Sequence, residues 1–185
     1  MVIYTKKGDK GTTKLPYDTR KRSKSHCRVR SLGEIDELNS AIGAACAFTK
    51  EKGVRDMLAQ VQHDLFRVQM DLASKGAVFK EKSIKPIADQ KVKWLEKRID
   101  EMQEKLTPLS TFILPGGSPA GALAQLSRAI CRRAERELAA LRKKEKVNPE
   151  VVKYINRLSD FLFVIARFIN KKEGEKETHP DYYKK

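Results

Sequence analysis

Apolar residues recur at the spacing of an α-helix in five separate stretches, and this periodicity restricts the possible folds more than any other feature of the chain. Two stretches open with a capping residue followed by proline, Ser118-Pro119 and Asn148-Pro149, as is typical of a helix start. The helices are predicted over about residues 33–49, 54–76, 92–106, 119–141 and 149–169. Five helices joined by short loops predict an all-α five-helix bundle, and a parallel α/β sheet is excluded because only residues 2–4 hint at a strand.

The length of 185 residues is enough for one domain with its own apolar core. We expect a single domain over 1–185, with an N-terminal glycine- and lysine-rich loop segment over 1–30, the helical bundle over 33–172 and a charged, frayed tail over 174–185. No stretch approaches the roughly 20 apolar residues of a membrane span. Nor does an apolar region follow the N-terminus, as it does in a secretory signal. We therefore expect a cytoplasmic protein with no membrane partner.

The formal net charge of +15 arises from 39 lysine and arginine residues against 24 acidic ones. Such an excess favours anionic partners, which are nucleic acids, membrane surfaces or phosphorylated small molecules. A lysine-rich solvated surface explains it equally well, because much of the excess lies in lysines dispersed among acidic residues. The net charge therefore leaves both interpretations open.

The fourth predicted helix carries four arginines within nine residues, at positions 128, 132, 133 and 136. They repel one another unless carboxylates or phosphates pair with them, and the planar guanidinium suits both partners. The stripe flanks the apolar positions Cys131 and Ala134, which predicts that Arg128 and Arg132 lie near the bundle interior. The alternative is a solvated face that Glu135 and Glu137 partly neutralise.

Further polar residues on neighbouring helices are candidates to pair with these arginines. Asp36 on the first helix and Asp160 on the fifth are expected to pair with Arg128 or Arg167, because an unpaired buried charge costs several kcal/mol. No nucleophile with an adjacent base is evident. An enzyme built from these residues would work by positioning and electrostatics.

The N-terminal segment is rich in glycine, lysine and threonine over residues 5–14. Glycines allow backbone N–H groups to turn toward an anion, while lysine and threonine supply charge and hydroxyl donors. The segment lacks the GxxxxGK[ST] pattern of a Walker loop. By itself such a segment is more typical of a flexible basic tail than of a binding site.

Five segments in order along the chain resemble the PduO-type ATP:cob(I)alamin adenosyltransferases. They read YTKKGDKGTT from Tyr4, RVRSLGEIDELNSAIG from Arg28, FILPGGS from Phe112, SRAICRRAERE from Ser127 and YINRLSDFLFVIAR from Tyr154. The chain departs from the family pattern in three places. Lys7 stands where the family usually has threonine, Leu15-Pro16-Tyr17-Asp18 replaces the usual LFGG, and Gln125 replaces a common histidine.

The resemblance implies a five-helix bundle that forms homotrimers, with ATP bound between neighbouring subunits. The implied reaction transfers the 5′-deoxyadenosyl group of ATP to cob(I)alamin, which gives adenosylcobalamin and triphosphate. The implied cofactors and substrates are ATP, cob(I)alamin and Mg²⁺, and the ligands of the metal stay unassigned. No nucleic-acid partner is implied.

The resemblance also implies roles for individual residues. The N-terminal residues that would wrap the triphosphate are Thr5, Lys6, Lys7, Gly8, Thr13, Lys14 and Lys24. The helical residues that would complete the nucleotide site are Arg132, Arg133, Ala134, Glu135, Arg136 and Asn156. Asp36 and Arg128 would form an ion pair between subunits. Phe112 would displace the lower axial ligand of the corrinoid, and Phe163 would line the corrinoid pocket.

Two other functions compete with this one. A basic helical nucleic-acid binder would carry exposed lysine and arginine interleaved with aromatic residues, whereas these arginines follow a core stripe and aromatic residues are few. The second rival is a related bundle that binds ATP or a corrinoid as a sensor or chaperone without turnover.

Overall fold

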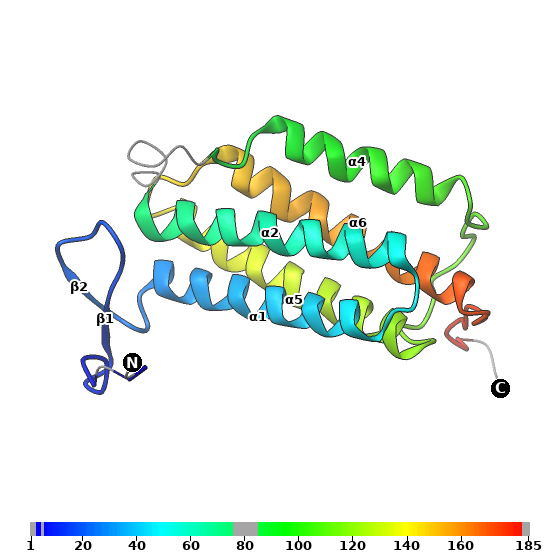
Figure 1. The fold of residues 1–185 in the computed structure, drawn as a ribbon, viewed down its shortest axis with the longest axis horizontal. Helices are drawn as coiled ribbons and strands as arrows, with labels where there is room; N and C mark the ends of the chain where they lie inside the picture. Colours follow the sequence, from blue (N-terminus) through cyan, green and yellow to red (C-terminus); the bar gives the residue numbers. More distant parts are fainter. Residues whose placement is uncertain (1–2, 5, 76–84, 183–185) are drawn as a thin grey trace.

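The computed structural model describes residues 3–4, 6–75 and 85–182, in which five long helices pack side by side and a small hairpin precedes them (Figure 1). The hairpin strands and the helices have the following bounds: β1 Thr12–Lys14, β2 Lys21–Ser23, α1 Cys27–Phe48, α2 Lys52–Ser74, α4 Asp89–Gln103, α5 Pro119–Arg142 and α6 Pro149–Lys172. The all-α five-helix prediction is confirmed.

The helices enclose one apolar core. α1 packs between α2 and α5, α5 packs against α6, and α6 packs against α4. Each helix contributes side chains with no exposed surface to this core, for example Ile35, Leu58, Leu95 and Phe161. Burial of such side chains contributes roughly 1.5–3 kcal/mol each and is the main force that holds the helices together.

The predicted helix starts at Ser118 and Asn148 are confirmed. The Ser118 hydroxyl accepts a hydrogen bond from the amide of Gly121, and the Asn148 side chain accepts one from the amide of Glu150. Both caps satisfy amides that the helix leaves without partners, and proline follows each cap at the first helical position.

The predicted start of the first helix at residue 33 is wrong, because α1 begins at Cys27. Its first turns are buried through polar residues, which hydrophobic periodicity does not detect. Arg28 is only 1% exposed and donates to the carbonyl of Leu72 over 2.6 Å. Ser31 is also buried and donates to the carbonyl of Cys27 over 3.0 Å.

The segment over 1–30, predicted as a loop, contains the antiparallel hairpin as well as the first turn of α1. Thr12 pairs with Ser23, and Lys14 pairs with Lys21. The hairpin lies beside the start of α1 at one end of the bundle, whereas the connection from α4 to α5 lies at the other end (Figure 1).

The described helices include none that is both long and apolar enough to cross a membrane.

The start of α5 is fixed by Asn170 on α6. The side-chain oxygen of Asn170 accepts hydrogen bonds from the amide and the hydroxyl of Ser118, and its amide donates to the carbonyl of Gly116 over 2.8 Å. A Cβ atom added at Gly121 would lie 1.9 Å from that oxygen. The close approach of the two helices therefore requires glycine at this position.

We expect Gly121→Ala to lower the free energy of unfolding by about 1–3 kcal/mol, because Asn170 must move away from Ser118 to admit the methyl group. Urea denaturation measures the change. Gly53→Ala is the matched control, since nothing lies within 4 Å of a Cβ there and stability should hold or rise slightly. Equal stability of the two variants would contradict this account of the helix contact.

Candidate functional site

The four arginines of α5 divide into two groups by their partners. Arg133 donates to the carboxylate of Glu34 over 2.5 Å and also to that of Glu37, both on α1. The hydrogen bonds that Arg133 donates to Glu34 and Glu37 raise the pKa of Arg133. Its charge is thus compensated within the chain.

Arg128, Arg132 and Arg136 form no ion pair with any carboxylate of the residues that the structure describes. Arg132 and Arg136 are exposed, and Arg136 donates to the carbonyl of Arg132 over 3.0 Å. The prediction that Arg132 lies near the bundle interior is therefore wrong. An arginine side chain is long enough to leave a buried backbone position and reach water.

Arg128 is half-buried, and its polar partner is neutral. Its Nε donates to the side-chain oxygen of Gln125 over 2.9 Å, and its guanidinium lies 6.0 Å from the ring centre of Phe163. Burial, followed by the charge of Arg132, lowers the pKa of Arg128. A partly buried guanidinium without a counter-ion favours binding of an anion from outside the chain.

An open groove of about 680 Å³ runs along this face between α4, α5 and α6. The charged and aromatic residues that line it are Glu96, Asp100, Arg128, Arg132, Arg157, Asp160 and Phe163. This volume is within the range of small-molecule sites.

Asn156 donates to the carboxylate of Glu135 over 2.7 Å on the same α5–α6 face, whereas Ala134 is fully buried in the core.

The predicted pairing of Asp36 or Asp160 with Arg128 or Arg167 is wrong within the chain. Asp36 accepts a hydrogen bond from Gln69 on α2 over 3.1 Å. Asp160 pairs with Arg157 on its own helix, and Arg167 pairs with Glu177. Helical periodicity gives the face on which a residue lies but not which neighbouring helix supplies its partner.

The glycine loop folds into a turn that brings Gly8 and Lys24 together. The carbonyl of Gly8 accepts a hydrogen bond from the amide of Gly11, whose positive φ of 71° favours glycine. Gly11 in turn accepts a hydrogen bond from the amide of Lys24, and the Lys24 ammonium lies 3.4 Å from the place of a Cβ at Gly8.

The other predicted loop residues lie along the same short segment. Thr13 and Lys14 belong to β1, and Lys6 and Lys7 are exposed before the turn. Lys6 adopts a positive φ of 56° and places its ammonium 5.6 Å from the ring centre of Tyr4. Thr5 lies outside the described residues.

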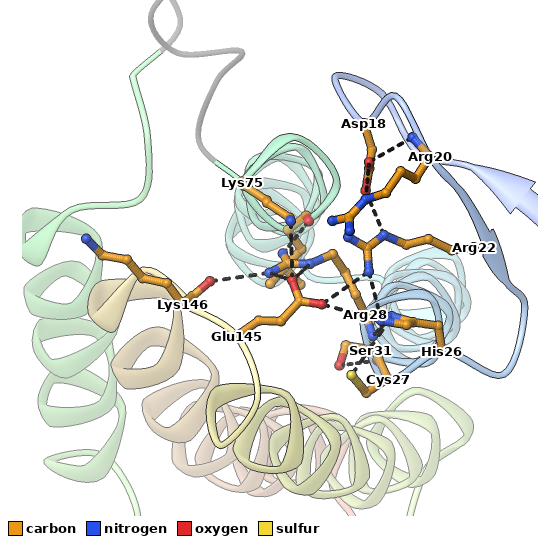
Figure 2. Close-up of polar contacts among 11 residues, drawn as sticks. Asp18, Arg20, Arg22, His26, Cys27, Arg28, Ser31, Lys75, Glu145 and Lys146 are labelled. Carbon is orange, nitrogen blue, oxygen red and sulfur yellow. Dashed lines mark hydrogen bonds and ion pairs between the residues drawn. The ribbon is translucent and has the colours of Figure 1, made fainter.

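One carboxylate, that of Glu145, anchors the hairpin to the bundle (Figure 2). It pairs with Arg22 of β2 over 3.3 Å and with Arg28 of α1 over 2.9 Å, and it lies 3.6 Å from the ammonium of Lys75. Burial raises the pKa of Glu145, but the hydrogen bond and charge of Arg28, together with Lys75 and Arg22, outweigh it and lower the pKa overall.

Sequence reasoning missed this anchor. Its members come from the hairpin, from α1 and from the connection after α5, and 117 positions separate Arg28 from Glu145. No local pattern joins residues so far apart. The one available signal is the pair of charged residues near the end of the loop segment, Arg22 and Arg28, which the structure shows to be half-buried and buried.

The same cluster contains the one group of three possible metal ligands that lie within 4.8 Å of one another among the described residues, namely His26, Cys27 and Glu145. This donor set does not fit Mg²⁺, which prefers oxygen ligands in octahedral geometry. Three basic side chains already surround the carboxylate of Glu145.

Phe112 lies far from the glycine loop of its own chain. It belongs to the connection before α5 and is 80% exposed, whereas the hairpin is anchored through Glu145 beyond the end of α5 (Figure 1). The 24 residues of α5, a helix about 36 Å long, lie between the two. One chain therefore does not bring all the predicted site residues together.

A helical bundle with uncompensated arginines beside a groove is suited to bind a polyanionic small molecule. The cobalamin adenosyltransferase family matches residues 3–169. The chain is 42% identical over 178 residues to a corrinoid adenosyltransferase of Bacillus subtilis, covering 94% of this chain and 89% of the relative. It is 37% identical over 184 residues to the human corrinoid adenosyltransferase MMAB, covering 95% and 71%.

The fold agrees with a solved structure from the same group of proteins. A variant of a PduO-type ATP:corrinoid adenosyltransferase from Lactobacillus reuteri, complexed with cobalamin and ATP, superposes with a TM-score of 0.88 at 33% identity, and the match covers 97% of this chain and 99% of that one. The chain belongs to the cobalamin adenosyltransferase family and is of the PduO type.

Asp18, between the two hairpin strands, pairs with Arg22, which also pairs with Glu145, and its carboxyl group gives a prediction for stability in acid. A hydrogen bond from the Arg20 amide and another from Arg22 lower the pKa of Asp18 to about 2 from 3.8. A depressed pKa means that the ionised form stabilises the fold above pH 3.8 and that this stabilisation is lost as the pH falls toward 2. We expect Asp18→Asn to lose less stability than the wild type across this interval, as measured by urea midpoints. Parallel pH profiles for the two proteins would contradict the assignment.

Proposed function

We propose that this enzyme, an ATP:corrinoid adenosyltransferase, transfers the 5′-deoxyadenosyl group of ATP to cob(I)alamin. The family match over nearly the whole chain is the main support for this reaction. The nucleotide site is supported by Arg128, Arg132 and Arg136, which have no carboxylate partner among the described residues. The Co(I) electron pair forms the cobalt–carbon bond at C5′ while the bond from C5′ to oxygen breaks. Triphosphate leaves with the electrons of that bond.

This reaction needs alignment and charge stabilisation rather than a general base. The leaving triphosphate gains negative charge, and the exposed guanidiniums of Arg132 and Arg136 are suited to receive it. The lysines near Gly8, which include Lys24, would hold the other side of the triphosphate. Arg133 would contribute less to phosphate binding, because Glu34 and Glu37 already compensate its charge.

The active site is proposed to form between subunits of a homotrimer. The separation of Phe112 and the glycine loop by the length of α5 supports this, as does the lack of a counter-ion at Arg128. Asp36 is exposed on α1, on the side next to α2, and is suited to pair with Arg128 of the next subunit. Such a head-to-tail contact closes into a ring under three-fold symmetry.

An exposed apolar surface near Asp36 supports the same arrangement. Phe66 on α2 and Tyr17 after the hairpin strand β1 are both substantially exposed, and with Leu32 they line a shallow apolar pocket. Exposed aromatic residues that are grouped together are typical of protein–protein contacts.

Mg²⁺ is proposed to enter with ATP, held by its phosphates and water. Magnesium sites in nucleotide enzymes commonly use substrate phosphates with one or two carboxylates rather than a complete protein cage.

The corrinoid is proposed to approach the face that carries Phe112 and Phe163. Phe163 lies near the guanidiniums of both Arg128 and Arg167, each 6.0 Å from its ring centre. Phe112 would displace the lower axial ligand and make Co(I) accessible by reduction.

The deciding assay follows the spectrum of reduced cobalamin with Mg-ATP under anaerobic conditions. ATP binding without formation of the cobalt–carbon bond would favour a sensor or chaperone.

We expect Arg132→Ala to weaken ATP use about 10- to 100-fold with the melting temperature unchanged, because a charged hydrogen bond contributes about 1.5–3 kcal/mol. Arg133→Ala should lose less ATP affinity, since its guanidinium is shared with Glu34 and Glu37. Calorimetric ATP titration and thermal melts measure the two effects. Arg142→Ala, at an exposed arginine in the last turn of α5, is the control and should change neither. Equal ATP affinities of Arg132→Ala and Arg142→Ala would refute the role of Arg132.

Mixing two inactive variants tests the site between subunits. We expect Lys24→Ala and Arg132→Ala trimers to be nearly inactive alone and to regain activity when the subunits are assembled together. Roughly a quarter of the interfaces then combine an intact loop with an intact helix, if subunits assort at random. The adenosylation rate of the mixture is the measurement. A mixture as inactive as its components would place the whole site within one chain.

A further inference from the structure

The tail after α6 folds back onto the loop that carries Phe112. This contradicts the prediction of a frayed tail over 174–185 for the residues described there. The amide of Leu114 donates to the carbonyl of Thr178 over 2.8 Å, in the manner of a short strand pairing. The amide of Glu175 donates to the carbonyl of Asn170, which also holds the start of α5.

Arg167 fixes the tail at its first contact. It is 5% exposed, and its guanidinium donates to both carboxylate oxygens of Glu177, over 2.5 and 3.2 Å. It also donates to the carbonyl of Thr107 over 2.7 Å. A buried guanidinium with these three bonds joins the tail to the beginning of the Phe112 loop, and removal of its carboxylate partner would leave the charge unpaired.

His179 fixes the tail at its second contact. Its Nδ1 lies 2.9 Å from the carbonyl oxygen of Phe112 and 2.9 Å from the hydroxyl oxygen of Thr111. A carbonyl oxygen can only accept, so Nδ1 carries the hydrogen and donates to Phe112. Two consecutive tail residues, Thr178 and His179, therefore hold the loop through its backbone at residues 112 and 114 and through the side chain of Thr111.

The side chain of Phe112 itself is exposed and has no packed surroundings to orient it. Its direction therefore depends on its backbone, which the tail holds. A group that must press against a ligand works better when its orientation is fixed before binding, because less conformational freedom is lost in the complex.

We propose that Glu177, Thr178 and His179 form a positioning strap that holds Phe112 in the orientation in which it displaces the lower axial ligand of the corrinoid. The strap acts through Phe112 and touches neither ATP nor the cobalt. This inference rests on the proposed role of Phe112 in the adenosyltransferase reaction.

The test compares His179→Ala with His179→Asn in the full chain. Asparagine places an amide N–H near the position of Nδ1 and keeps the donor, whereas alanine removes it. The readout is the fraction of cob(II)alamin that becomes four-coordinate on the enzyme with ATP, measured by absorption and electron paramagnetic resonance. ATP affinity and melting temperature are measured in parallel.

We expect His179→Ala to lower the four-coordinate fraction and the turnover number about 5- to 20-fold, corresponding to the loss of one positioning hydrogen bond. ATP affinity should be unchanged, and His179→Asn should restore most of the fraction. Glu177→Gln is a second variant and should act in the same direction, because it breaks the ion pair with Arg167. Glu175→Gln, at an exposed tail residue, is the matched control and should behave as wild type.

An unchanged four-coordinate fraction in both His179→Ala and Glu177→Gln would overturn the strap. So would an equal loss of ATP affinity, which would indicate a general structural role. Phe112→Ala separates this result from a failure of the proposed function. If Phe112→Ala forms the four-coordinate species as well as wild type, the proposed role of Phe112 is wrong. If Phe112→Ala loses this species while His179→Ala and Glu177→Gln keep it, only the strap is refuted.

Discussion

A buried guanidinium must find a carboxylate or several carbonyl oxygens, and this requirement organises both ends of the bundle. Arg28 at one end is satisfied by Glu145 and the carbonyl of Leu72. Arg167 at the other end is satisfied by Glu177 and the carbonyl of Thr107. In each case the pairing ties a segment outside the helices to the core. Those two segments are the hairpin and the tail, and they hold the two loops proposed to meet substrate.

The length of the helices then determines where a complete site can form. Because α5 separates the glycine loop from Phe112 within one chain, a nucleotide held by the loop and a corrinoid held by Phe112, as proposed, would meet only where different subunits adjoin. The exposed Asp36 and the half-buried Arg128 lie on different faces, which suits a head-to-tail contact. Assembly and catalysis would thus depend on the same interface.

The arginine helix shows how charge is divided between structure and function. Arg133 is compensated by Glu34 and Glu37 across the contact of α5 with α1. Arg128, Arg132 and Arg136 face the other side, where they form no ion pair with a carboxylate of the described part of the chain. The same residue type on one helix therefore braces two helices on one face and leaves positive charge available for phosphates on the other.

Local signals in the sequence determined the helices, since caps such as Ser118 and Asn148 and the apolar periodicity act over only a few residues. The motif resemblance predicted which residues belong to the site. Tertiary structure alone decided the partners, because an ion pair such as that of Arg28 with Glu145 joins positions 117 residues apart. For that reason the early start of α1, the pairing of Arg133 and the contact of His179 with Phe112 were not evident beforehand. Periodicity measures burial of apolar groups, and these features depend on buried polar ones.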